Sequence, residues 1–317
     1  MKRNRNFILT SVAILFREQG YGRVIGSDFV LKKKTRNHRC LLVLFLVILV
    51  ILTSWIIWGN ITVGTTLWDI HDTNLPSSFE GYKIAQISDL HNAEFGQENS
   101  RLLKILQREA PDIIVFTGDL VDSGHTDIEI AVSFAKHAME IAPCYYVTGN
   151  HEAWLKEQYS ELEKKLEDCG VRVLRNQSEI LTSGDDRTQL IGIDDPDFSE
   201  SDSGMFDFTA DIILSEIESA GDEEDYKILL SHRPEVFDTY VEKNINLVLC
   251  GHAHGGQFRF PFLGGIVAPN QGLFPEYDGG LYRKESTTMV VSRGIGNSIL
   301  PVRFNNRPEV VVIVLHS

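Results

Sequence analysis

The sequence predicts a single α/β domain, with a largely parallel sheet and flanking helices, preceded by one transmembrane helix. Two observations carry this prediction. An apolar run centred near residue 50 is long enough to cross a bilayer. After about residue 82, short apolar runs alternate with helix-periodic segments, as they do in βαβ units. Residues 82–317 suffice for one large domain with a buried core, but not comfortably for two.

The first 39 residues are strongly basic. They carry ten Lys or Arg against two acids, a net charge of +8, so the total of −14 leaves −22 for residues 40–317. We expect segment 1–39 to be cytoplasmic or disordered. The acidic remainder argues against nucleic acid as a partner, because attraction to a phosphate backbone needs a basic surface.

The apolar run Leu41–Trp58 is interrupted only by Thr53 and Ser54. As a helix it would be roughly 27 Å long, close to the thickness of a bilayer's hydrocarbon core. It is longer than a signal-peptide core and no small-x-small cleavage site follows it, so we interpret 40–60 as an uncleaved signal anchor. The alternative is a buried core helix. Basic residues precede the run and are scarce after it, which predicts a single-pass protein of the cell membrane with an extracytoplasmic domain.

The elements that follow the anchor are expected in a regular order. A polar linker at 61–81 leads into the domain at 82–317. Strands are expected near 82–88, 112–117, 143–148, 171–175, 188–193, 226–231, 246–250, 288–292 and 309–315. Helical patterns lie near 98–109, 126–140, 153–168, 209–219 and 234–243. The run Glu309–Leu315 is almost wholly apolar, which is typical of a strand buried on both faces.

Five short motifs come directly after five of these strands. Because ligand sites in open α/β sheets form beyond the carboxyl ends of strands, we expect the motifs to converge in space. They are Asp89-Leu90-His91, Gly118-Asp119-Leu120-Val121-Asp122, Gly149-Asn150-His151-Glu152, Ser231-His232 and Gly251-His252-Ala253-His254.

The five motifs, in this order, resemble those of the calcineurin-like metallophosphoesterases. The resemblance runs from about Tyr82 onward. It implies a four-layer α/β/β/α sandwich. The chain also looks like the membrane-associated YaeI/YkuE-type branch of that family, through the segments Gly251–Gln257, Gly272–Pro275 and Val291–Gly294.

The resemblance also implies a dinuclear metal site. It assigns one metal to Asp89, His91, Asp119 and His254, and a second to Asp119, Asn150, His232 and His252, with Asp119 as the bridge. Mixed imidazole, carboxylate and amide ligands suit Mn, Fe or Zn better than Ca or Mg. A hydroxide held between the two ions would be the nucleophile.

Other polar residues have less definite expected roles. His151 is the candidate acid for the leaving oxygen, and Asp122 or Glu152 are candidates for orienting it or a ligand histidine. Arg259 and Arg293 are candidate contacts for substrate phosphate. An acidic loop beginning at 194 is interpreted as solvated rather than as an extra metal site. Five further histidines are interpreted as structural or solvated: His38, His71, His125, His137 and His316.

The sequence as a whole predicts a membrane-anchored, metal-dependent hydrolase of a phosphodiester or pyrophosphate bond. A phosphomonoesterase is the alternative within that class. A non-catalytic phosphatase-like scaffold is the alternative outside it, but none of the expected ligands is missing. A lipid-linked or nucleotide-sugar pyrophosphate substrate is suggested only by the branch resemblance and the anchor. Whether Cys144 and Cys169 pair remains open.

Overall fold

The computed structural model describes residues 27–199, 209–220, 226–297 and 300–317. The chain divides into two compact units, Met1–Thr53 and Ser54–Ser317. The basic segment predicted at 1–39 lies largely outside the described residues, and so do residues 200–207 of the acidic loop.

The first described element is the long helix α1 (Ser27–Ile61). Its segment His38–Ile61 has a mean hydropathy of 3.1 over an 18-residue window, and none of that window is buried against the protein. The predicted anchor Leu41–Trp58 lies within this segment. By length and composition the segment is able to cross a membrane.

The second unit contains two six-stranded mixed sheets. The first has the strand order β1-β16-β2-β3-β4-β5, with β1 at Gly64–His71, β16 at Glu309–His316, β2 at Lys83–Ile87, β3 at Ile113–Thr117, β4 at Cys144–Val147 and β5 at Arg172–Val173. The second has the order β14-β15-β9-β8-β7-β6, with β14 at Gly280–Lys284, β15 at Thr287–Val291, β9 at Leu247–Cys250, β8 at Lys227–Leu230, β7 at Asp186–Gly192 and β6 at Gln177–Ser183.

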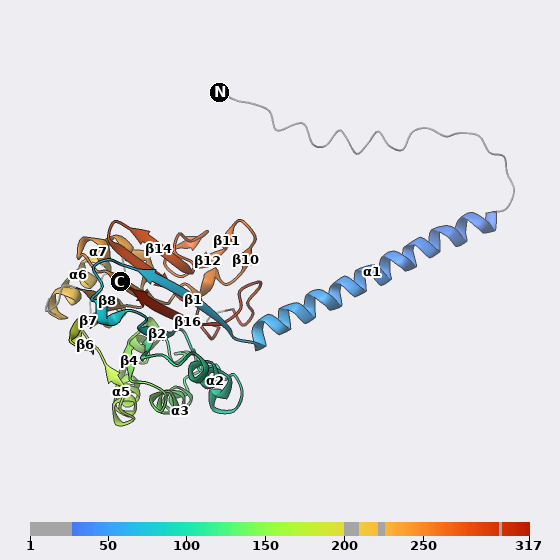
Figure 1. The fold of residues 1–317 in the computed structure, drawn as a ribbon. Helices are drawn as coiled ribbons and strands as arrows, with labels where there is room; N and C mark the ends of the chain where they lie inside the picture. The colour runs from blue at the N-terminus through green and yellow to red at the C-terminus, as the bar shows by residue number, and fades with distance from the viewer. Residues whose placement is uncertain (1–26, 200–208, 221–225, 298–299) are drawn as a thin grey trace. The chain divides into compact units, whose positions relative to one another are not determined.

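Helices cover the outer face of each sheet. On the first sheet lie α2 (Ser100–Glu109), α3 (Ile128–Met139) and α5 (Tyr159–Asp168), and on the second lie α6 (Thr209–Ala220) and α7 (Phe237–Glu242). Figure 1 shows these two groups of helices on different sides of the domain. The predicted helix at 153–168 is divided into α4 (Asn150–Trp154), a 3-10 turn and α5.

Three apolar clusters fill the spaces between these four layers. Alternate residues of one strand enter different clusters: Ile114 and Phe116 of β3 pack under the helices, whereas Ile113 and Val115 pack against the second sheet. A third cluster joins the second sheet to α6 and α7. The period-2 geometry of a strand therefore accounts for the buried pattern on both faces. The predicted α/β/β/α sandwich is confirmed.

Three strands of the two six-stranded sheets lie outside the ranges that the sequence predicted. The strand β1 lies within 61–81, where a linker was expected, and pairs in parallel with β16 along its whole length. Its side chains mostly alternate between exposed and half-buried, as in an edge strand, and its polar residues made the sequence resemble a linker. The other two, β6 and β14, are the antiparallel edge strands of the second sheet, and in the first sheet β16 runs antiparallel to β2. Both sheets are therefore mixed, although most of their strand pairs are parallel.

Candidate metal centre

The five motifs converge beyond the carboxyl ends of β2, β3, β4, β8 and β9. The loops after these strands bring together seven candidate ligands, all of them buried: Asp89, His91, Asp119, Asn150, His232, His252 and His254. This placement follows from the parallel strands, whose carboxyl ends share one edge of each sheet.

The first group consists of Asp89, His91, Asp119 and His254. One donor atom from each lies within 4.8 Å of the others. The Nε2 atom of His254 is 3.4 Å from Asp89 Oδ1 and 3.1 Å from His91 Nε2. The four donor atoms therefore surround one position where a cation would fit.

The second group consists of Asp119, His232 and His252, again within 4.8 Å of one another. The Oδ2 atom of Asp119 is 3.2 Å from His232 Nε2 and 3.5 Å from His91 Nε2 of the first group. One carboxylate oxygen thus faces both groups, which is the geometry that a bridging ligand requires.

Two further observations are consistent with metal binding at this site. The Nδ1 atom of His232 is 2.8 Å from the Thr117 carbonyl, and because a carbonyl only accepts, Nδ1 carries a proton. The Nε2 atom faces Asp119 and is the nitrogen that would bind a metal ion, which is the usual arrangement when the other ring N–H donates to a carbonyl. The Oδ1 atom of Asn150 is buried without any hydrogen-bond partner. A buried acceptor of this kind is costly unless something binds it.

The backbone around the site is held in an uncommon conformation. Six non-glycine residues at the ends of β2, β3 and β9 have φ between +45° and +67°: Asp89, His91, Asn92, Asp119, His252 and His254. The left-handed region costs an L-residue about 1–2 kcal/mol and tends to occur at functional sites. Hydrogen bonds between the two loops fix it here, since Asp89 N–H donates to Gly118 O and His91 N–H donates to Asp119 O, both at 3.0 Å.

The buried carboxylate of Glu152 joins the loops after β3 and β4. Its Oε2 accepts the backbone N–H groups of Asp119 and Gly149, each at 2.8 Å, and its Oε1 accepts that of Val121 at 3.3 Å. Gly149 must lack a side chain, because a Cβ there would lie 2.3 Å from Asp119 Oδ1. Of the two candidate orienting residues, Glu152 positions the backbone of the site, whereas Asp122 Oδ2 lies 3.7 Å from His91 Nδ1.

Burial and neighbouring charges divide the histidines by protonation. Desolvation lowers the pKa of His91 to about 4 and that of His254 to about 3, and it also lowers the pKa of His252. Desolvation acts in the same direction on His232, but the adjacent Asp119 carboxylate prevails and raises its pKa to about 10. Three imidazoles are therefore neutral and available as ligands at pH 7, and His232 holds the proton that a metal ion would displace.

His151 lies beside the first group. Its Nδ1 accepts the backbone N–H of Ser123 at 3.0 Å, so the neutral ring carries its proton on Nε2. Its ring centroid is 4.5 Å from that of His91, in a T-shaped contact. The fixed tautomer leaves an N–H donor on the other side of the ring from Ser123.

The two candidate phosphate-binding arginines are bound to carboxylates. Arg259 pairs with Asp278 at 3.0 Å, and Arg293 pairs with Glu309. Their contact with substrate stays a prediction. Among the described residues, the arginines that approach a candidate ligand are Arg233 and Arg303 instead.

Arg233 and Arg303 were not identified from the sequence. Arg233 Nη1 is 3.4 Å from His252 Nε2, and its guanidinium is held by the buried Asp195 at 2.6 and 2.7 Å. Arg303 Nη2 is 3.4 Å from His254 Nδ1. The position of Arg233 next to His232 was an available signal, but no motif surrounds Arg303.

The structure also tests what the sequence predicted for the acidic loop, the other histidines and the cysteines. The acidic loop is not solvated at its start, because Asp194 and Asp195 are both buried. Asp194 pairs with Arg175 at 2.8 Å, and Asp195 pairs with Arg233 at 2.6 Å. The side chain of His125 is 96 % exposed, and His71 stacks on His316 with ring centroids 4.6 Å apart. All four cysteines are unpaired.

Comparisons with known proteins agree with this geometry. A family model described as calcineurin-like phosphoesterase matches residues 82–256. The chain is 30% identical over 263 residues to YkuE of Bacillus subtilis (strain 168), described as an uncharacterized metallophosphoesterase, covering 80% of this chain and 86% of YkuE.

Two further proteins are similar in sequence to this chain. Phosphodiesterase YaeI of Escherichia coli (strain K12) is 26% identical over 245 residues, covering 74% of this chain and 82% of YaeI. A bovine transmembrane protein with metallophosphoesterase domain is 29% identical over 255 residues, covering 77% of this chain and 55% of that protein.

Proposed function

Since the chain belongs to the calcineurin-like phosphoesterase family, we propose that it is a membrane-anchored, dinuclear metal-dependent hydrolase of a phosphodiester or pyrophosphate bond. The observation that carries the proposal is the position of Asp119 Oδ2 between two buried groups of histidines. The groups share one carboxylate, as two closely spaced ions require.

The proposed ligands are the seven buried residues at the strand ends. Asp89, His91, Asp119 and His254 would hold one ion, and Asp119, Asn150, His232 and His252 would hold the other. When bound, such ions provide a nucleophile from water at neutral pH and neutralise charge on the phosphoryl group. The imidazole donors favour Mn, Fe or Zn.

His151 would act on the leaving oxygen. The backbone N–H of Ser123 keeps the ring proton on Nε2, so a neutral His151 is able to donate a hydrogen bond to that oxygen. Donation of a proton would require the charged imidazolium ring, because a neutral imidazole would have to become an imidazolate. Arg233 and Arg303, which touch the outer nitrogens of His252 and His254, would hold these rings rather than bind substrate.

The proposed setting is a membrane surface. The segment His38–Ile61 would be the anchor, and the basic residues before it would keep that side cytoplasmic. A phosphodiester or pyrophosphate, lipid-linked or a nucleotide sugar, is the proposed substrate class. The activity named for the relative YaeI, a phosphodiesterase, supports the bond type.

A hydrolysis screen of the full chain tests this function. The protein is purified in a neutral detergent, freed of metal, reloaded with Mn, Fe or Zn, and assayed against monoesters, diesters and pyrophosphates. We expect metal-dependent turnover of diesters or pyrophosphates. Turnover of monoesters alone would establish the alternative, a phosphomonoesterase, and metal binding without any turnover would favour a scaffold.

A further inference from the structure

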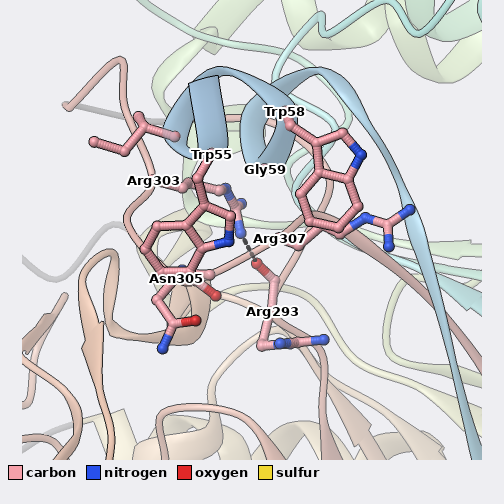
Figure 2. Close-up of a pocket in the computed structure, with 9 residues that line it drawn as sticks. Trp55, Trp58, Gly59, Arg293, Arg303, Asn305 and Arg307 are labelled. Atoms are coloured by element: carbon pink, nitrogen blue, oxygen red, sulfur yellow. Dashed lines mark hydrogen bonds between the residues drawn. The ribbon is translucent and has the colours of Figure 1, made fainter. Parts of the chain in front are cut away.

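A cavity of about 160 Å³ lies between the last turns of α1 and the residues Arg293 and Arg303–Arg307. We name it the arginine pocket. Figure 2 shows Trp55 and Trp58 projecting from α1, with Arg303 near Trp55 and Arg307 beside Trp58. The lining side chains that matter here are Trp55, Trp58, Arg293, Arg303, Asn305 and Arg307.

The arginine pocket contains more positively charged side chains than neighbouring carboxylates to pair with them. Arg293 is paired with Glu309, but among the described residues neither Arg303 nor Arg307 has a carboxylate within ion-pair distance. Arg303 is only 2% exposed and donates to the carbonyl oxygens of Arg293 and Gly296. A buried cation without a counter-ion is unfavourable, so the site favours an anion.

Arg303 carries its charge at neutral pH, because the guanidinium group of arginine is not deprotonated in proteins. Arg307 donates to the Thr62 carbonyl at 3.3 Å and lies over the Trp58 ring, 4.9 Å from its centroid. Two guanidinium groups in one cavity suit a phosphate, which accepts charge-assisted hydrogen bonds.

Aromatic side chains line the pocket and continue beyond it. Trp55 and Trp58 are 41% and 51% exposed and end an apolar helix of membrane length, where tryptophan is typical of the bilayer interface. Trp55 contacts Phe304, which contacts Phe260 of β10 (Arg259–Phe260), each pair with ring centroids 5.4 Å apart. The hairpin loops beyond expose Phe262, Leu263, Leu273 and Phe274.

We propose that the arginine pocket binds the phosphate group of a membrane lipid. Arg303 and Arg307 would bind the phosphate, and Trp55 and Trp58 would contact the apolar part of the lipid. The site is separate from the metal centre but adjoins it, because Arg303 Nη2 is 3.4 Å from the outer nitrogen of His254.

The test counts lipids retained by the full chain in native mass spectra after incubation in neutral detergent with phosphatidylglycerol. Diacylglycerol with the same acyl chains is the comparison, since it lacks only the phosphate headgroup. An Asp119→Asn background removes the proposed metal bridge, so a lipid held as a substrate at the metal centre would not be counted. Loss of hydrolysis in this background is a separate result that bears on the proposed function.

The decisive variant is Asn305→Asp. Asn305 is exposed at φ +49°, and aspartate has the same shape, so the change places a carboxylate at the pocket without a steric cost. Asn244→Asp is the matched control, because Asn244 is also exposed, at φ +52°, but lies after α7. Arg307→Gln removes one binding cation directly, and Arg283→Gln, on the exposed part of β14, is its control.

We expect phosphatidylglycerol to be retained and diacylglycerol not. Asn305→Asp and Arg307→Gln should each lower retention about tenfold, the worth of one charge-assisted hydrogen bond, and both controls should leave it unchanged. Equal retention of diacylglycerol, or full retention by Asn305→Asp, would overturn the proposal. Inorganic phosphate that binds in the pocket while phosphatidylglycerol does not would show that free phosphate is the occupant and overturn the lipid.

Discussion

At the scale of single residues, Asp119 has the largest predicted effect. Because its Oδ2 faces both groups of histidines, Asp119→Asn should remove most bound metal and essentially all hydrolysis. Mass spectrometry measures the metal content, and turnover of a diester measures hydrolysis. Asp127→Asn is the control, since Asp127 caps the exposed start of α3 and asparagine caps a helix equally well. Two ions retained by an active Asp119→Asn protein would refute the dinuclear site.

His151 should be sensitive to the leaving group. A general acid matters most when the departing oxygen is basic, so His151→Gln should cost on the order of 10²–10⁴-fold with an alkyl diester and little with a nitrophenyl diester. Metal content should not change. Equal losses on both substrates would reassign His151 to positioning or to stabilisation of charge.

Metal affinity of the metal-free chain should rise with pH. Asp119 holds the pKa of His232 near 10, so below that pH a proton must leave before an ion binds. We expect up to tenfold tighter binding per pH unit between pH 6.5 and 9, and release of about one proton, by calorimetry in buffers of different ionisation enthalpy. His91, His252 and His254 add nothing in this range, because their pKa values are lowered. Binding independent of pH would contradict this protonation.

The sequence revealed some of these residues more readily than others. Asp89, His252 and His254 belong to short motifs after apolar strands, and the structure brings them together with the other expected ligands. Arg303 gives no such signal, since its contact with His254 joins residues 49 positions apart. Asp195 was read as part of a polar loop, because its burial depends on Arg233, which a linear pattern does not place beside it.

At the scale of elements, α4 depends on Glu152. Three backbone N–H groups from two loops donate to its carboxylate, and glutamine offers only one oxygen in its place. Glu152→Gln should therefore lower the free energy of unfolding by about 1–3 kcal/mol, measured by denaturant titration of the full chain in detergent. Glu157→Gln, exposed on the following turn, should have no effect. An unchanged midpoint for Glu152→Gln would mean that these hydrogen bonds contribute no net stability.

Elements with continuous apolar character were predictable, and edge strands were not. β16 is a run of valine, isoleucine and leucine, and it is buried in the interior of its sheet. β1 exposes every second side chain, and four of its first six residues are glycine, threonine or aspartate, so its pattern resembles a linker. Its pairing is decided by a partner more than 200 residues away in the sequence.

At the scale of the whole molecule, the orientation of the domain is testable. The basic residues before α1 and their scarcity after it predict that the domain lies outside the cytoplasm. A protease added to intact cells or spheroplasts should degrade the domain after residue 60 and leave the first 39 residues protected. Protection of the domain, with cleavage only after lysis, would reverse the orientation.

The pairing of β1 with β16 imposes an order on biosynthesis. β16 lies between β1 and β2 in the first sheet, yet it is translated after every other strand of the domain. A growing chain therefore displays β1 and β2 without the strand that joins them until synthesis reaches residue 316. Across that interval both carry unpaired backbone groups, so the nascent polypeptide would need shielding by chaperones from association with its neighbours.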